Sequence, residues 1–275
     1  MSGHEHWQLD GSAPELDQRY LVPAITSIWA ADLIDRVQPK RGEAVLDVAC
    51  GTGVVTRLAA ERVTTGRVIG LDLNEGMLTV ARSVPHTGVP IEWLQGSALA
   101  LPVNDGAIDL VLCQLGLQFF PDRACAVREM KRVLASSGRV ALSVYSAIER
   151  TPGAEAFASA LDERLGPDAS KIKRAEHIFA DANEVGDLLR KEGLDDVELY
   201  TVTKTISFPS VLDYVRFQLI ATPMAGLLAD RQASERDSVI EAVASATRLR
   251  LDPSMMVDGR FSFPQEAHIA IASKL

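Results

Sequence analysis

Short apolar runs alternate with amphipathic helical patterns between residues 44 and 144. This alternation is typical of a parallel, doubly wound α/β sheet, in which a helix follows each strand. The apolar runs predict strands at 44–48, 67–72, 90–95, 108–113 and 139–144, and the amphipathic patterns predict helices at 53–62, 75–83 and 122–134. Right-handed crossovers then place the carboxyl ends of the first strands along one ligand crevice.

Local signals refine the boundaries of this core, which we place at about 42–146. Asn74 and Asp122 are expected N-caps, because their side chains accept hydrogen bonds from the first turn of a helix. The sequence Ser136-Ser137-Gly138 predicts a turn before the fifth strand.

Helical segments flank the core. Residues 12–38 predict an N-terminal helical cap with a capping box from Ser12 to Glu15 and a division at Pro23. The mixed segment 150–180 is expected to form part of a lid. The residues after 180 predict a helix at 182–192 that ends at Gly193, followed by a strand within 195–203. Residues 205–262 are expected to form the rest of the lid, with two helices capped by Ser210 and Ser234, and the last strand is predicted within 266–273. Together these elements predict a seven-stranded, mostly parallel sheet in one domain over residues 1–275.

Composition narrows the class of protein. A chain of 275 residues with 47% hydrophobic residues can bury a full core, and its net charge of −9 argues against a nucleic-acid partner. The three cysteines, Cys50, Cys113 and Cys125, lie in or beside predicted core elements and are expected to be reduced. The sequence shows neither a signal peptide nor an apolar run of about 18 residues, so we expect a cytoplasmic protein without membrane contact.

One stretch, Val45 to Thr56, concentrates the chemistry. An apolar strand ends in Asp47, passes through a turn that contains Ala49, Cys50, Gly51 and Gly53, and enters a helix. Small residues let a ligand approach the backbone, and the helix N-terminus presents free N–H groups to it. The alternative is a tight turn without a ligand.

Acidic residues at two successive strand ends argue for a cationic ligand. Asp47 would repel a pyrophosphate, and the third glycine of a dinucleotide fingerprint is missing at Thr56. Asp72 ends the next strand about 20 residues after the turn, where an acid takes ribose hydroxyls. S-adenosyl-L-methionine carries an ammonium and a sulfonium but no phosphate, and it fits both acids.

These segments resemble class I S-adenosylmethionine-dependent methyltransferases, in particular those of quinone and natural-product biosynthesis. The first motif of that family runs acid-x-Gly-x-Gly-x-Gly, and here Ala49 replaces its first glycine. Residues 95–102 are similar to the third motif, with Ser97 in place of the acid that holds the adenine amino group. The passages around Gln114 and Gln118 are similar to the segments that flank the methionine part of the cofactor.

The resemblance implies a cofactor site and an acceptor pocket under the lid. The implied cofactor-binding residues are Tyr20, Asp47, Ala49, Cys50, Gly51, Gly53, Asp72, Leu73, Met77, Gly96, Ser97, Ala98, Gln114 and Gln118. The expected acceptor-binding residues are Tyr145, Phe217 and Met224, with Tyr20 beside them. Phe119 and Phe120 fit either this site or core packing.

The sequence therefore predicts methyl transfer to a small-molecule acceptor by in-line displacement. Such a reaction needs the nucleophile, methyl group and sulfur in a line and water excluded, which is consistent with the lack of a strong catalytic motif. No general base or metal ligand is assigned. His4, His6, His86 and His268 are expected to be structural or on the surface, whereas the lid could bring His177 to the pocket. Two alternatives stay open: other chemistry with the bound sulfonium, and a cofactor-binding module without turnover. The oligomeric state is open, with a homodimer allowed.

Overall fold

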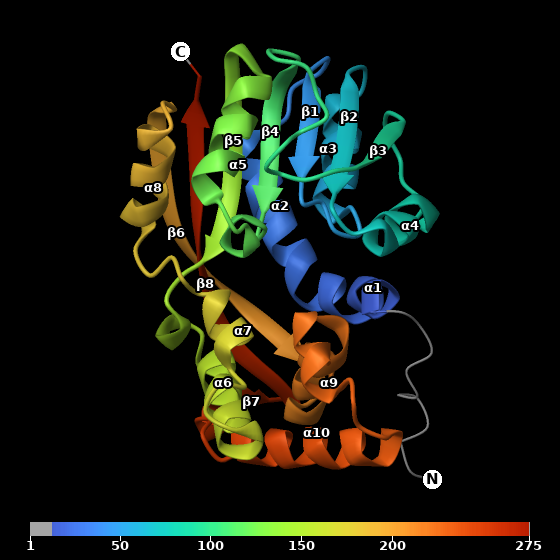
Figure 1. Ribbon diagram of the computed structural model, residues 1–275, viewed down its shortest axis with the longest axis vertical. Coiled ribbons are helices and arrows are strands. Elements are labelled where there is room, and N and C mark those ends of the chain that lie inside the picture. Colours follow the sequence, from blue (N-terminus) through green and yellow to red (C-terminus); the bar gives the residue numbers. More distant parts are fainter. Residues whose placement is uncertain (1–12, 275) are drawn as a thin grey trace.

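The central sheet in the computed structural model, which describes residues 13–274, follows the alternation of the sequence (Figure 1). Its strands run β3-β2-β1-β4-β5-β8-β6, parallel as far as β5, with β8 antiparallel to both neighbours and β7 paired to β8 off this path. The strands are β1 (Ala44–Val48), β2 (Arg67–Asp72), β3 (Ile91–Gln95), β4 (Ile108–Gln114), β5 (Leu134–Tyr145), β6 (Asp195–Phe208), β7 (Met256–Val257) and β8 (Arg260–Ser273). The predicted doubly wound, seven-strand path is confirmed, and the two-residue β7 is an addition to it.

Helices cover both faces of the sheet because side chains alternate along each strand. In β4, Leu110 and Leu112 pack with the helices of one face, and Val111 and Cys113 pack with those of the other. The first face carries α2 (Ser27–Val37) and α3 (Val54–Val63), and the second carries α5 (Arg123–Val133) and α8 (Ala182–Lys191), while α4 (Glu75–Ser83) packs beside β2 and β3. The loops at the carboxyl ends of the strands are thereby left to form a site.

Most of the predicted caps are present. The side chains of Asn74 and Asp122 accept backbone N–H groups at 2.8 Å, and Ser210 accepts the N–H of Asp213 at 3.0 Å. Gly193 follows α8 with φ of +80°, a left-handed conformation that favours glycine.

Two local predictions are wrong. Residues 136–138 do not form a turn before β5 but lie within it, where the pairing with β4 shifts register and Gly138 has no room for a side chain. Ser234 is not the cap of α10 (Ala233–Arg248). The helix begins earlier, at Gln232, whose backbone N–H donates to the Glu235 carboxylate at 3.1 Å.

The N-terminal helical segment is continuous from residue 13 to residue 37. It starts as α1 (Ala13–Leu16), continues as a π-helix (Asp17–Thr26) and becomes α2. Pro23 lies inside the π-helix and does not divide the segment, contrary to the prediction. The changes of helix type fall after Leu16 and after Thr26 instead. The predicted capping residue Ser12 lies outside the described residues.

Strands β6 and β8 run beyond the rest of the sheet into a second layer (Figure 1). They pair as far as Phe208 opposite Phe261, whose buried rings continue the alternation of the strands. The prediction therefore ended β6 too early, at residue 203, and began β8 too late, at residue 266. The second layer contains α6 (Pro152–Leu165), α7 (Lys171–Ala175), α9 (Val211–Ala221), the 3₁₀-helix Pro223–Leu228 and α10. No helix within residues 13–274 is long and apolar enough to cross a membrane.

Candidate active site

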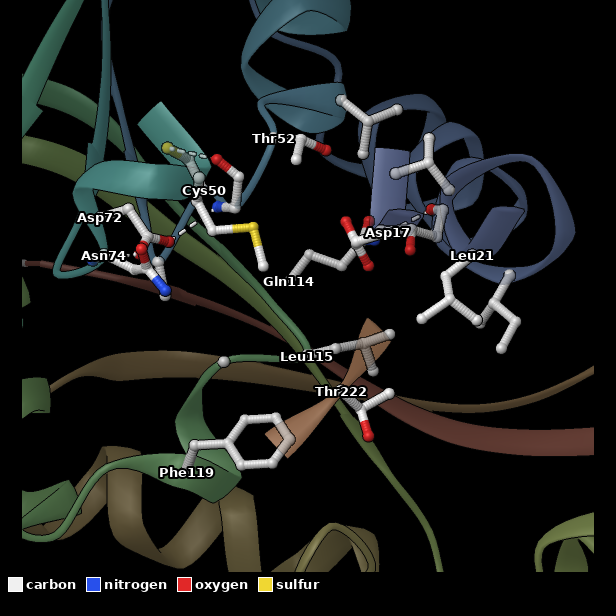
Figure 2. Close-up of a pocket in the computed structure, with 18 of the residues that line it drawn as sticks. Asp17, Leu21, Cys50, Thr52, Asp72, Asn74, Gln114, Leu115, Phe119 and Thr222 are labelled. Carbon is white, nitrogen blue, oxygen red and sulfur yellow. Dashed lines mark hydrogen bonds between the residues drawn. The ribbon is translucent and has the colours of Figure 1, made fainter. Parts of the chain in front are cut away.

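A cavity of about 410 Å³ lies at the carboxyl ends of β1, β2 and β4 and is also lined by the π-helix. Figure 2 shows Cys50, Asp72 and Asn74 on one side of it and Asp17 opposite, with Gln114 between them. Its size is that of a small-molecule site, and its lining combines apolar side chains with a few polar ones.

The glycine turn forms one wall of the cavity. Ala49, Gly51 and Gly53 all have positive φ, of +57°, +56° and +85°. A Cβ atom at Gly51 would meet no atom within 4 Å, so the bare backbone of this residue faces open space beside the ligand site. A Cβ atom at Gly53 would instead lie 2.3 Å from the Trp93 ring, so position 53 needs a glycine because the Trp93 ring packs against it. Gly51 is thus the residue at which a bound molecule can reach the turn.

Asp72 fixes the conformation of this turn. Its two carboxylate oxygens accept the backbone N–H groups of Gly51 and Asn74, each at 2.8 Å. An ionised carboxylate accepts about four hydrogen bonds, so its remaining lone pairs are free to accept from a ligand. Since Asp72 also lines the cavity, one side chain positions the turn and presents an acceptor for hydroxyl groups.

Two further aspartates make this end of the cavity receptive to cations. Asp47 is buried and accepts the Thr56 hydroxyl at 2.6 Å. Burial raises the pKa of Asp47 to about 7, and the nearby charge of Asp72 adds to the effect. Desolvation likewise raises the pKa of the half-buried Asp17 on the π-helix to about 7. A cationic ligand would stabilise the ionised form of both acids.

Gln114 supplies an unused hydrogen-bond acceptor. Its Nε2 donates to the Thr26 carbonyl at 3.0 Å, while its buried Oε1 has no partner among the described residues. An unpaired buried acceptor is costly, and the ammonium of a ligand would satisfy it. Burial raises the pKa of the neighbouring Cys50 thiol, which therefore stays neutral. These residues fit S-adenosyl-L-methionine.

The other half of the cavity has a different character. It is mostly apolar, with Leu115, Phe119, Phe120, Ala221 and Pro223 in its lining. Figure 2 shows Phe119 and Thr222 together along this side. Polar residues of the lining that come from β5, α7, α9 and the residues just after them are Tyr145, Lys173, Glu176, Gln218 and Thr222.

Tyr145 and His177 stack beside this apolar half, with ring centroids 5.2 Å apart. His177 Nδ1 lies 2.8 Å from the Ser146 carbonyl oxygen and donates to it. Burial lowers the pKa of His177 to about 3, and the charge of Lys173 acts in the same direction. The imidazole is therefore neutral at physiological pH. His177 does not itself line the cavity, although it lies beside the lining residue Tyr145.

The structure brings eight of the predicted site residues into the cavity lining: Asp47, Ala49, Cys50, Gly51, Asp72, Met77, Gln114 and Tyr145. The others lie outside that lining: Tyr20, Gly53, Leu73, Gly96, Ala98, Ser97, Gln118, Phe217 and Met224. Leu73 is 71% exposed, while the Ser97 hydroxyl accepts the N–H of Leu99 at 3.1 Å within a local turn. Phe217 stacks on Tyr20 in the second-layer core, where Met224 is also buried, so these side chains are core residues.

Sequence reasoning missed several lining residues. Asp17, Lys173, Glu176 and Gln218 belong to segments that the sequence places only coarsely, on the N-terminal cap and the lid. Asn74 was predicted only as a helix cap, and in the structure it also lines the cavity. Among these missed residues, only Asn74 carried a local sequence signal, namely its position as a helix cap.

Comparison with known proteins places this geometry among methyltransferases. A model of the ubiE/COQ5 methyltransferase family matches residues 21–208. The chain is 39% identical over 120 residues to the 2-phytyl-1,4-naphtoquinone methyltransferase of Thermosynechococcus vestitus, which covers 43% of this chain and 53% of that protein. It is 32% identical over 189 residues to the demethylmenaquinone methyltransferase of Lactococcus lactis, which covers 62% and 73%. The chain therefore spans about half the length of the first of these relatives.

A solved structure supports the fold. The SAM-dependent methyltransferase of Thermotoga maritima superposes with a TM-score of 0.53 over 95% of both chains, at 17% identity. At this identity the likeness concerns the fold alone.

Proposed function

Because the chain belongs to the ubiE/COQ5 methyltransferase family, we propose that it transfers a methyl group from S-adenosyl-L-methionine to a ring carbon of a quinol, the reduced form of a quinone. The observation that carries the proposal is the two-part cavity, with a carboxylate-lined glycine turn at one end and an apolar half at the other. The names of both relatives specify naphthoquinone-type or menaquinone-type acceptors, which supports this class.

The residues of the turn would hold the cofactor. Asp72 is placed to accept ribose hydroxyls, and Asp17 and Asp47 favour its positive charges. Gln114 Oε1 is available to the ammonium, and Gly51 gives the molecule access to the backbone. When bound, S-adenosyl-L-methionine supplies an electrophilic methyl group and a neutral thioether as leaving group.

The apolar half would hold the acceptor. A quinone ring is electron-poor, so it has to be reduced to a quinol before a ring carbon can act as a nucleophile toward a sulfonium methyl group. Phe119, Phe120 and Leu115 can pack against such a ring and exclude water. The ring carbon gains the methyl group and loses its hydrogen as a proton, while the sulfur keeps the electron pair of the broken bond.

The test is a methyl-transfer assay with the cofactor and reduced demethylmenaquinone carrying a short prenyl tail, under anaerobic conditions. We expect a product heavier by one methylene unit, detected by mass spectrometry. Cofactor binding by calorimetry without any product would overturn the proposal and favour a binding module.

Two glycine variants provide a matched control for this assay. Gly51 and Gly106 both have positive φ, of +56° and +67°, and a Cβ atom at either would meet nothing within 4 Å. Only Gly51 lines the cavity. Gly51→Val should therefore abolish cofactor binding and turnover, whereas Gly106→Val carries the same backbone strain and should leave both intact. Equal losses in both variants would mean that strain, and not a blocked site, is responsible.

A further inference from the structure

A buried ion pair lines the cavity next to α9, the helix that contributes Ala221 to the apolar half. Lys173 and Glu176 are only 4% and 5% exposed, and Lys173 Nζ donates to Glu176 Oε2 at 2.6 Å. The same Nζ donates to Gln218 Oε1 at 3.1 Å, which joins α7 to α9. All three side chains line the cavity.

Stability does not explain this pair. Removing two charges from water costs about as much as their attraction returns, and apolar replacements of buried pairs are often neutral or stabilising. Among the ion pairs of residues 13–274, this one is the most buried, with both side chains below 10% exposure. It is also set in the aromatic second layer, where burial raises the pKa of Tyr145 and Tyr214 and the charge of Glu176 raises it further. Its position on the cavity suggests a role in binding.

The pair still has hydrogen-bonding capacity toward the cavity. A lysine ammonium has three donors, and two of them are used by Glu176 and Gln218. Glu176 Oε2 accepts from Lys173, and its Oε1 is a second acceptor. Lys173 is the one cationic side chain in the lining of the described cavity. A donor and an acceptor therefore stand next to each other at the wall.

We propose that Lys173 and Glu176, held in place by Gln218, form a subsite that selects acceptors with a hydroxyl group, a refinement that rests on the proposed function. A hydroxyl can donate to Glu176 and accept from Lys173 at the same time. A carbonyl or ether oxygen can only accept, and it leaves Glu176 Oε1 without a donor. The subsite thus distinguishes the quinol from the quinone, and the enzyme binds its acceptor in the reduced form that can be methylated.

The experiment measures binding of two matched ligands to the chain saturated with S-adenosylhomocysteine. The ligands are 1,4-dihydroxynaphthalene and 1,4-dimethoxynaphthalene, which share a ring but differ in the ability to donate. Under anaerobic conditions we expect the wild type to prefer the dihydroxy compound by about 10- to 150-fold, the range for a hydrogen bond to a charged group. A ratio near one in the wild type would overturn the proposal.

The key variant removes the whole pair. Single substitutions leave an uncompensated buried charge and risk unfolding, whereas Lys173→Met together with Glu176→Leu replaces both charges by apolar groups. This double variant should keep its thermal stability and its affinity for S-adenosylhomocysteine, and its ligand ratio should fall to about one. The control, Lys204→Met with Asp32→Leu, removes a lysine–carboxylate pair away from the cavity and should keep the wild-type ratio.

The outcomes separate this proposal from the proposed function. A wild type that methylates the quinol while its double variant retains the full ligand ratio contradicts the subsite alone. A wild type that shows the hydroxyl preference, lost in the double variant, but transfers no methyl group supports the subsite and contradicts the proposed function. Failure of the wild type to bind either compound overturns the subsite.

Discussion

Affinity for the cofactor should increase with pH, because two carboxyl groups of the cavity have pKa values of about 7 before a ligand binds. A group with that pKa is about one-tenth ionised at pH 6 and about three-quarters ionised at pH 7.5. If the cationic cofactor requires the ionised form, each of Asp17 and Asp47 contributes about an eightfold gain over this interval. The usual pKa of an α-amino group is about 7.7–8.0, so at least about 60% of the ligand ammonium is still charged at pH 7.5, and its partial loss offsets the gain by less than about twofold.

Isothermal titration calorimetry at constant ionic strength provides the measurement. Titrations in two buffers of different ionisation enthalpy count the protons released, and we expect net release near pH 7. Asp17→Asn should remove about one of the two eightfold factors, while the control Asp168→Asn, an exposed acid outside the cavity, should not. A dissociation constant that changes less than twofold between pH 6 and 7.5, with no proton release, would refute the reasoning.

The stability of the unliganded protein should change in the opposite direction. An acid whose pKa is raised by folding binds more protons in the folded state than in the unfolded state between about pH 4 and 7. The free energy of unfolding then falls as pH rises through that window, by at most about 1.4 kcal/mol per pH unit for the buried Asp47. The thermal shift produced by the cofactor should accordingly be larger at pH 7.5 than at pH 6.

Two further substitutions test the cofactor end. Asp72→Ala removes the acceptor of the Gly51 and Asn74 N–H groups and should weaken cofactor binding about 10- to 150-fold. Calorimetry, with Asp72→Asn as the shape-preserving control, checks this, and a change below twofold in a folded protein contradicts it. Gly70→Ala places a Cβ atom 2.4 Å from the Trp93 ring and should lower the free energy of unfolding by about 1–3 kcal/mol. Urea unfolding should show most of that loss recovered when Trp93→Leu is added, and wild-type stability in the single variant would count against the contact.

The cofactor end was predictable because its determinants are local. An apolar strand, an acid, small residues and a helical pattern follow one another within twelve positions, and each has a conformational reason. Ala49 shows the limit of such reasoning. The sequence identifies Ala49 as a departure from the family motif. The space for its methyl group, however, is left by Gly116, which lies far along the chain and has no side chain. A Cβ atom at Gly116 would lie 2.9 Å from the Ala49 methyl carbon.

The acceptor end could not be predicted in the same way. Lys173 and Glu176 occur in a charge-rich stretch that resembles an exposed helix. They are buried only because α7 packs against α6 and the 3₁₀-helix Pro223–Leu228 and because Lys173 bonds to Gln218 of α9. The π-helix offers no distinct periodicity either, so Asp17 could not be placed on the cavity. Phe217 and Met224 were expected at the pocket because the lid that carries them should lie over the strand ends, and in the structure both are buried in the core of the second layer.

The two ends of the cavity therefore differ in how they are encoded, and this bears on specificity. The cofactor wall comes mainly from β1, β2 and the residues just after them, within the segment matched by the family model. Gln218, Ala221, Thr222 and Pro223 come from α9 and its end, beyond residue 208 where that match stops. Substitutions in this later segment can reshape the acceptor wall without disturbing Asp72 or the glycine turn, because within residues 13–274 no hydrogen bond of the turn reaches α9. Acceptor choice in this chain is accordingly separable from cofactor binding. The segment matched by the family model and the later segment are joined at the cavity wall by the hydrogen bond from Lys173 to Gln218.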